Sequence, residues 1–267
     1  MKTITAKDNP ALKKARKLLK NKYRAELSSF LVEGRKLINE AVSAGFETEL
    51  VFIDAGAHAR GEAAVGEYPN EILLDEKLFR ELAQTKTPQP YIAIVNRDLS
   101  WNGKGEDAAA CSTKEPSQVL ILDRISDPGN AGTLIRTALA AGIAEVWCLK
   151  GTADIFSDKC LRASAGAVFH IPVLEGLSAG ECLGLLRDLK MRLFVCDAHG
   201  KNMYDTYMAD NIAIAVGNES TGPQDEFLKA ADQIIRVPME DRSESLNAAV
   251  CGAVAMYEAR RQRGEKG

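Results

Sequence analysis

The chain has 267 residues, of which 46% are hydrophobic and 27% are charged, and its formal net charge is −3. This length allows one or two globular domains with a buried core, and the composition excludes a mostly disordered or collagen-like chain. No apolar run is long enough to span a membrane and the first eight residues lack the apolar core of a signal peptide, so we expect a cytoplasmic protein.

The cysteines and histidines show no metal-binding pattern. No two of the six cysteines form a CxxC pair, and the three histidines lack the spacing of metal ligands. A disulfide framework is typical of much shorter secreted chains. We therefore expect no metal and no disulfides, but reduced and mostly buried thiols.

Positive charge is concentrated at the start of the chain. Residues 1–36 contain eleven Lys or Arg and three acidic residues, which leaves a net charge of +8 there and −11 in the rest. Such asymmetry is typical of proteins that bind polyanions. A solvated, lysine-rich helix face would produce the same pattern, and charge alone does not distinguish the two.

The first third of the chain predicts alternating helices and strands. A helix begins at Asp8-Asn9-Pro10, because a capping residue precedes a proline, and its apolar residues lie on one face with most of its lysines on the other. Two further helices are expected, one ending near Gly45 and one capped by Asp75 and running to Leu82. Strands are expected over 30–32, 50–53, 71–74 and 91–95. This alternation predicts a small α/β domain over residues 1–97.

Residues 98–117 are polar and contain glycine, which predicts a linker. The remainder, residues 118–267, predicts a second α/β domain. Strands are expected over 119–122, 146–149, 193–196, 212–216 and 234–237, with a turn over 127–130, a helix from there to about Ala141 and a final helix over 247–261. The final helix carries Val250, Ala253, Val254 and Tyr257 on one face, and its small residues suit close packing, including packing against a second subunit.

Three polar loops follow buried strands, over 127–132, 217–222 and 238–247. In open parallel sheets, ligands bind beyond the carboxyl ends of the strands. The chain contains no P-loop, no G-x-G-x-x-G after a strand and no G-x-S-x-G, which argues against nucleoside triphosphatases, dehydrogenases and serine hydrolases. Taken singly, the loop residues have ordinary explanations: Asn130 suits a turn, Asn247 suits a helix cap and Arg136 suits a solvated helix face.

Together, the three loops resemble the signature motifs of the SpoU/TrmH family, which are knotted RNA ribose 2′-O-methyltransferases that use S-adenosylmethionine. The resemblance rests on residues 127–138, 217–222, 237–239 and 245–250, with a further family-like segment over 162–167. It covers about residues 117–263. The N-terminal part resembles the family's ribosomal-protein-like RNA-binding domain, most closely over residues 30–34.

The resemblance implies an α/β fold with two parts. The C-terminal domain is expected to be a parallel sheet with a deep trefoil knot of the SPOUT type, preceded by a smaller N-terminal α/β domain. It also implies a homodimer in which the cofactor is held in the knot. Periodicity alone does not predict a knot, because knots are very rare.

Site residues follow from the resemblance by their positions in the motifs. The catalytic set is Arg136, Asn130, Glu219, Ser245 and Asn247, and the cofactor set is the backbone of Gly217, Val237 and Leu246 with a contact from Asp197. Family members often carry an uncharged residue at the position of Asp197. We expect Arg136 to clamp the phosphate next to the target ribose rather than act as a base, because a guanidinium stays protonated at ordinary pH. No metal is needed for this reaction.

The resemblance also provides a partner for the basic N-terminal face. Lys13, Lys14, Arg16, Lys17 and Lys20 are expected to contact RNA phosphates without reading sequence. The expected reaction is S-adenosylmethionine-dependent methylation of a ribose 2′-hydroxyl in RNA, with 23S ribosomal RNA favoured because the extra domain suits a large structured RNA.

Three alternatives stay open: a tRNA substrate, a catalytically silent RNA-binding or ribosome-assembly factor, and a nucleotide-binding oxidoreductase. The intact catalytic set argues against the silent factor, and the missing glycine fingerprint argues against the oxidoreductase.

Overall fold

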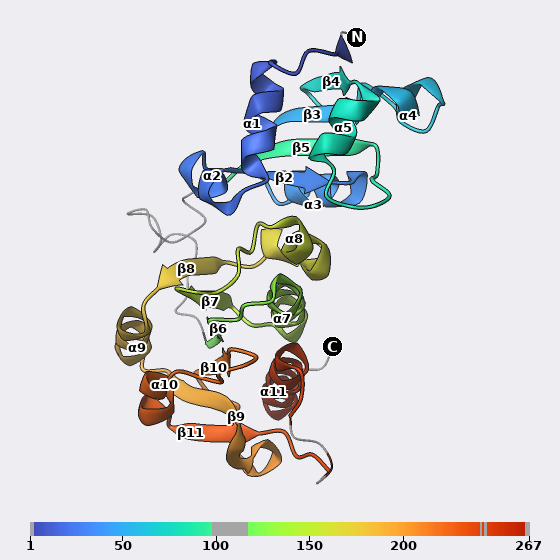
Figure 1. Cartoon of the computed structure of the whole chain (residues 1–267). Helices are drawn as coiled ribbons and strands as arrows, with labels where there is room; N and C mark the ends of the chain where they lie inside the picture. The colour runs from blue at the N-terminus through green and yellow to red at the C-terminus, as the bar shows by residue number, and fades with distance from the viewer. Residues whose placement is uncertain (1–2, 98–116, 241, 243–244, 265–267) are drawn as a thin grey trace. The chain divides into compact units, whose positions relative to one another are not determined.

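The computed structural model describes residues 3–97, 117–240, 242 and 245–264 (Figure 1). The chain divides into two compact units, the first comprising residues 1–99 and 156–162 and the second residues 100–155 and 163–267. The predicted linker lies outside the described residues except for Ser117. Within the described ranges, no helix is long and apolar enough to cross a membrane.

The first unit is built on a mixed sheet with strand order β1-β4-β3-β5-β2. Strand β3 is parallel to β4, whereas β5 is antiparallel to both β2 and β3. The strands are β1 (Thr3–Ile4), β2 (Ser29–Glu33), β3 (Thr48–Asp54), β4 (Glu71–Leu74) and β5 (Tyr91–Asn96). The helices are α1 (Pro10–Leu18), α2 (Asn21–Glu26), α3 (Arg35–Ser43), α4 (Ala55–Ala59) and α5 (Glu76–Leu82). The four predicted strands and three predicted helices are confirmed, while β1, α2 and α4 were not predicted.

Helix α1 begins where the capping pattern places it. The Asn9 side chain accepts hydrogen bonds from the backbone N–H groups of Ala11 and Leu12, at 2.9 and 3.3 Å. Leu12, Ala15 and Leu18 are buried in the core of the unit. The basic residues therefore lie on the outward side of an amphipathic helix that is anchored by its apolar stripe.

The second unit is a six-stranded parallel sheet with strand order β11-β9-β10-β6-β7-β8. Its strands are β6 (Gln118–Asp123), β7 (Glu145–Leu149), β8 (Val173–Leu177), β9 (Arg192–Asn202), β10 (Ile212–Gly217) and β11 (Gln233–Arg236). Its helices are α7 (Pro128–Ala141), α9 (Ala179–Asp188), α10 (Asp225–Ala230) and α11 (Ala248–Gln262), with 3₁₀ turns at Ala167–Phe169 and Met203–Asp205. Helix α8 (Asp158–Ser164) belongs to the first unit over residues 158–162.

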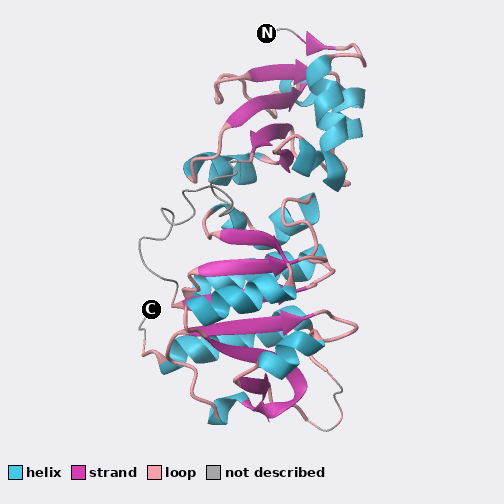
Figure 2. Cartoon of the chain, turned by 90° about the vertical axis from the view of Figure 1, so that its left-hand side faces the viewer, coloured by secondary structure: helices cyan, strands magenta, loops and turns pink. Residues whose placement is uncertain are grey.

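Helices cover both faces of this sheet. Helices α7 and α11 lie on one face and α9 and α10 on the other (Figure 1), and Figure 2 shows the strands running in one direction behind the second pair. Strands β6 and β10 are buried along their whole length, as expected for central strands of a doubly covered sheet. The predicted α/β fold with a parallel sheet is confirmed. Strand β8 and helices α8, α9 and α10 were not predicted.

One local prediction is wrong. The turn expected over 127–130 is the first turn of α7, because the Asp127 side chain caps the N–H of Asn130 at 2.9 Å and Pro128 starts the helix. On α11, the face expected to suit close packing, including packing against a second subunit, carries Val250 at 48% and Tyr257 at 50% exposure in the single chain. Close packing within the chain occurs on the opposite face, where a Cβ added to Gly252 would lie 2.5 Å from the Leu134 side chain.

Candidate active site

The three polar loops lie where β6, β10 and β11 end. Because all three strands are parallel, their carboxyl ends meet at one edge of the sheet. The loop after β6 leads into α7, the loop after β10 folds back on itself through a bridge between Asn218 and Gly222, and the segment after β11 leads into α11. Residues far apart in the sequence therefore meet at this edge.

A chain of hydrogen bonds joins one side chain from each loop. The Nδ2 of Asn247 donates to the Oδ1 of Asn130 at 3.1 Å, and the Nδ2 of Asn130 donates to the carboxylate of Glu219 at 2.9 Å. Three of the five predicted catalytic residues are thereby brought into direct contact. Each side chain in this series of hydrogen bonds donates to the next, and the series ends at the Glu219 carboxylate.

Helix caps involve both asparagines, one through its side chain and the other through its backbone. The Oδ1 of Asn247 accepts from the backbone N–H groups of Ala249 and Val250 at the start of α11, which turns its Nδ2 toward Asn130. The backbone N–H of Asn130 is held by the cap of Asp127. A capping side chain has little rotational freedom, so the Asn247 amide is placed before any substrate arrives.

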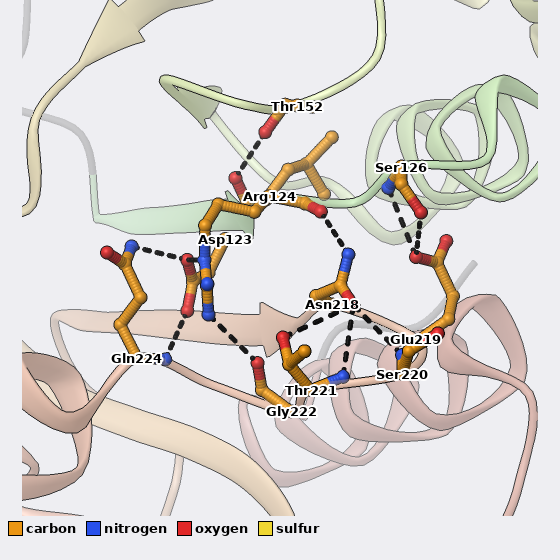
Figure 3. Close-up of polar contacts among 11 residues, drawn as sticks. Asp123, Arg124, Ser126, Thr152, Asn218, Glu219, Ser220, Thr221, Gly222 and Gln224 are labelled. Carbon is orange, nitrogen blue, oxygen red and sulfur yellow. Dashed lines mark hydrogen bonds and ion pairs between the residues drawn. The ribbon is translucent and has the colours of Figure 1, made fainter.

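The carboxylate of Glu219 has further donors. It accepts from the backbone N–H and hydroxyl of Ser126, at 3.1 and 2.9 Å (Figure 3), and from the backbone N–H of Asp127 at 3.3 Å. Partial burial works to raise the pKa of Glu219, but the hydrogen bonds from Asn130, from its own backbone and from Ser126 outweigh it and lower the pKa to about 2. Glu219 is therefore an anion at any ordinary pH and is suited to orienting donors rather than to carrying a proton.

A cavity of about 350 Å³ opens beside this chain. All four predicted cofactor residues line it, namely Asp197, Gly217, Val237 and Leu246, as do Glu219, Ser245 and Asn247. At Gly217 an added Cβ would lie 2.3 Å from the backbone nitrogen of Pro223, so only glycine permits the loop to fold this closely over the end of β10.

The chemistry of the lining suits a cationic nucleoside. Val216, Met239 and Leu246 provide apolar surface, and the carboxylates of Asp197 and Glu219 provide negative charge. Asp197 also accepts from the backbone N–H of His199 at 2.8 Å, which holds one of its oxygens. A flat apolar ring with a positive charge nearby, as in S-adenosylmethionine, matches both features.

Arg136 lies apart from this cluster. It is exposed on α7, does not line the cavity and forms no hydrogen bond or ion pair with any described residue. Six residues separate it from Asn130, which places it about 120° away around a helix of 3.6 residues per turn. The structure thus brings together Asn130, Glu219, Ser245 and Asn247, and leaves Arg136 free to contact a ligand outside the cavity.

Two cysteines also line the cavity. Cys196 is buried at the end of the straight part of β9, and Cys251 lies in the first turn of α11. The thiol of Cys196 hydrogen-bonds to Cys251. This hydrogen bond, together with burial, raises the pKa of Cys196, and the same hydrogen bond lowers the pKa of Cys251. All five described cysteines are free, and four of them are buried. No group of three His, Cys, Asp or Glu residues within the described ranges could hold a metal ion.

Sequence reasoning missed a second polar cluster at the end of β6. Asp123 is fully buried, and its carboxylate accepts from the backbone N–H and side-chain amide of Gln224, at 2.7 and 2.6 Å (Figure 3). Arg124 pairs with Asp123 at 3.1 Å. A carboxylate directly after an apolar run was the signal available in the sequence, because a buried charge needs dedicated donors.

The predicted RNA-binding residues, which lie on α1 and at the start of α2, divide into two groups. Lys13, Lys17 and Lys20 are exposed. Lys14 and Arg16 are half-buried and pair with Glu49 and Glu81 of the same unit. Among the residues that the structure describes, no carboxylate pairs with the first group.

Comparison with known proteins agrees with this architecture. Residues 117–257 match the SpoU rRNA Methylase family, and residues 9–93 match the MRM3-like substrate binding domain. The chain is 33% identical to the 23S rRNA (guanosine(2553)-2′-O)-methyltransferase RlmP of Bacillus subtilis, over 97% of this chain and 100% of that protein. It is 26% identical to a 23S rRNA (uridine(2479)-2′-O)-methyltransferase of Streptomyces viridochromogenes, over 90% and 85% of the two chains.

Solved structures show the same similarity. The SpoU methyltransferase AviRb of Streptomyces viridochromogenes in complex with AdoMet superposes with a TM-score of 0.82 at 25% identity, over 96% of this chain and 98% of that chain. An AdoMet-bound rRNA methyltransferase of Sinorhizobium meliloti superposes with a TM-score of 0.81 at 28% identity, over 97% of each chain.

Proposed function

Because the chain belongs to the SpoU rRNA methylase family, we propose that it transfers a methyl group from S-adenosylmethionine to a ribose 2′-hydroxyl of 23S ribosomal RNA. One observation carries this proposal: Asn247 and Glu219, which Asn130 joins by hydrogen bonds, line the same cavity as the predicted cofactor residues. We propose the cytoplasm as its location, because its proposed substrate is ribosomal RNA.

The cofactor would occupy the cavity between the ends of β9, β10 and β11. S-adenosylmethionine supplies an electrophilic methyl group on a sulfonium. The backbone of Gly217, Val237 and Leu246 would surround the adenosyl part, and the carboxylate of Asp197 would attract positive charge. The apolar lining excludes water, which strengthens these electrostatic contacts.

The polar rim would hold the target ribose. Asn247 and Asn130 offer oriented amide groups, Glu219 fixes the amide of Asn130, and Ser245 lies on the same cavity wall. Arg136 is unpaired among the described residues and would grip the phosphate next to the ribose with two parallel hydrogen bonds. That grip would orient the 2′-hydroxyl, whose proton would pass to the phosphate or to water.

The N-terminal unit would bind the RNA. We assign substrate binding to residues 1–97, methyl transfer to residues 118–267 and a linker to residues 98–117. Lys13, Lys17 and Lys20 would contact phosphates, whereas Lys14 and Arg16 chiefly hold α1 on its own domain through Glu49 and Glu81.

The second unit would form the deep trefoil knot of its family and pair with a second copy. The loops over 217–222 and 237–247 enclose one cavity, and α11 packs against α7 and β10 at Gly252, a compact arrangement that a knot would hold together. Leu139, Val250 and Tyr257 are 39–50% exposed on α7 and α11. A dimer would bury this apolar face. Replacing both Val250 and Tyr257 by Glu should convert the dimer to a monomer in light scattering; an unchanged mass would exclude this face.

Methyl incorporation tests the proposed reaction. Total RNA from cells lacking the protein is incubated with labelled S-adenosylmethionine and the wild type, Arg136→Ala or Arg136→Lys. We expect label in one large ribosomal RNA with the wild type and almost none with Arg136→Ala. Arg136→Lys should also fail, because lysine cannot form two parallel bonds, and near-normal turnover of this variant would refute the clamp. Label in tRNA would instead identify tRNA as the substrate. Cofactor binding without label in any RNA would favour an assembly factor.

A further inference from the structure

The loop over 217–224 borders the cavity and is attached at both ends to one dipeptide. At its start, the Nδ2 of Asn218 donates to the backbone carbonyl of Arg124 at 2.8 Å. At its end, the guanidinium of Arg124 donates to the carbonyl of Gly222 at 3.2 Å, and Gln224 donates twice to Asp123 (Figure 3). These hydrogen bonds therefore attach both ends of the loop to the end of β6.

Arg124 is held in an uncommon conformation. Its φ is 58°, in the left-handed region that a residue with a Cβ seldom adopts. Its aliphatic stem lies against Gly151, where an added Cβ would be 3.3 Å from the Arg124 Cγ. Its Nε pairs with the fully buried Asp123. Such strain persists only where the surroundings determine it, and it concentrates at functional sites.

We infer that Arg124 is a positioning residue for the cofactor: its side chain fixes the loop over 217–222 in the conformation that lines the cavity. The inference rests on the proposed function. A loop that is ordered before binding loses less conformational entropy when a ligand arrives, so the anchor acts on affinity. Glu219 has separate donors in Asn130 and Ser126, so the catalytic rim keeps its own support.

Binding of S-adenosylhomocysteine, measured by calorimetry on the full-length chain, tests this inference. Arg124→Ala removes the anchor, and Arg124→Gly removes it while relieving the left-handed strain, so at least one variant should keep the stability of the wild type. Both should raise Kd by about tenfold, the usual effect of losing a charge-assisted hydrogen bond. Arg124→Lys offers one point charge instead of a fork and should be intermediate. Arg187→Ala, which removes an exposed arginine of α9, serves as the control and should bind like the wild type.

Methyl-transfer kinetics separate positioning from a general loss of structure. We expect the KM for S-adenosylmethionine to rise with the Kd, while kcat at saturating cofactor and the KM for RNA stay within about threefold, as expected when binding is lost equally in the ground state and the transition state. Wild-type affinity for S-adenosylhomocysteine in Arg124→Gly would overturn the inference. A fall of about tenfold in kcat with an unchanged KM for S-adenosylmethionine would overturn it as well. Failure of the wild type itself to bind S-adenosylhomocysteine would instead refute the proposed function.

Discussion

Asn130 and Glu219 lie 89 residues apart in the sequence, yet the amide of one donates to the carboxylate of the other over 2.9 Å. The same Asn130 amide accepts from Asn247 through its oxygen. Because Glu219 can only accept, it determines which way the Asn130 amide faces, so the Asn130 oxygen is left to accept. The cap of α11 independently turns the Nδ2 of Asn247 toward that oxygen.

Asn130→Ala should break this chain at its centre. We expect the methyl-transfer rate to fall on the order of 10²-fold, because the ribose would lose an oriented partner. The Kd for S-adenosylhomocysteine should change little, since Asn130 does not line the cavity. Thr133→Ala is the matched control on α7, because among the described residues the Thr133 hydroxyl bonds only to the carbonyl of Gly129 in its own helix. A normal rate in Asn130→Ala would show that the chain does not serve catalysis.

The carboxyl group of Glu219 should titrate far below its usual range. Its pKa of about 2, against an ordinary value of 4.5, depends on the donors from Asn130 and Ser126, so replacing both by Ala should move the pKa back toward 4.5. Carboxyl ¹³C NMR of glutamate-labelled protein measures this, with Glu219→Gln to assign the signal.

The lowered pKa of Glu219 makes the free energy of unfolding depend on pH. The native pKa lies below the unfolded one, so ionised Glu219 stabilises the fold fully above about pH 4.5 and loses that effect as the pH falls toward 2. The advantage of the wild type over Glu219→Gln in urea unfolding should therefore shrink with acidification below pH 4.5. A signal titrating near 4.5 in the wild type would contradict the hydrogen-bond geometry.

Reversing Lys13, Lys17 and Lys20 to Glu should weaken RNA binding and flatten its dependence on salt. Each lost phosphate contact removes roughly 0.7 to 0.9 from the slope of log K against log salt. Binding of S-adenosylhomocysteine should stay unchanged, and Lys229→Glu, on the exposed side of α10, should leave RNA binding close to that of the wild type. A parallel loss of cofactor binding would argue against separate roles for the two units.

Cys251 should be the reactive thiol of the cavity. Its pKa is lowered by the hydrogen bond from Cys196, whereas burial raises the pKa of Cys148 to about 12. Alkylation by iodoacetamide near pH 8 should therefore reach Cys251 well before Cys148, as peptide mass spectrometry would show. Saturating S-adenosylhomocysteine should protect Cys251, and equal labelling with and without it would place the cofactor elsewhere.

The sequence by itself determined the local elements and the loops that matter. Caps such as Asn9 and Asp75, the apolar stripe of α1 and the buried runs at β6 and β10 depend on neighbours within a few residues, so pattern reading located them. The motif resemblance then named residues for a site. Where local signals competed, as at Pro128-Gly129-Asn130, turn-forming residues concealed a capped helix start.

Only the tertiary structure decided which of those residues meet. Asn130 and Arg136 belong to one motif, yet the turn of α7 sends the first to Glu219 and the second to solvent. Parallel strand order brings loops about a hundred residues apart to a single edge, and no periodicity encodes that order. The tertiary structure likewise decided that Asp123 and Arg124 hydrogen-bond to Gln224 and Gly222. It also decided which face of α11 is buried. These contacts join residues that are far apart in the sequence. Local patterns of residue type do not show which distant segments will pack together.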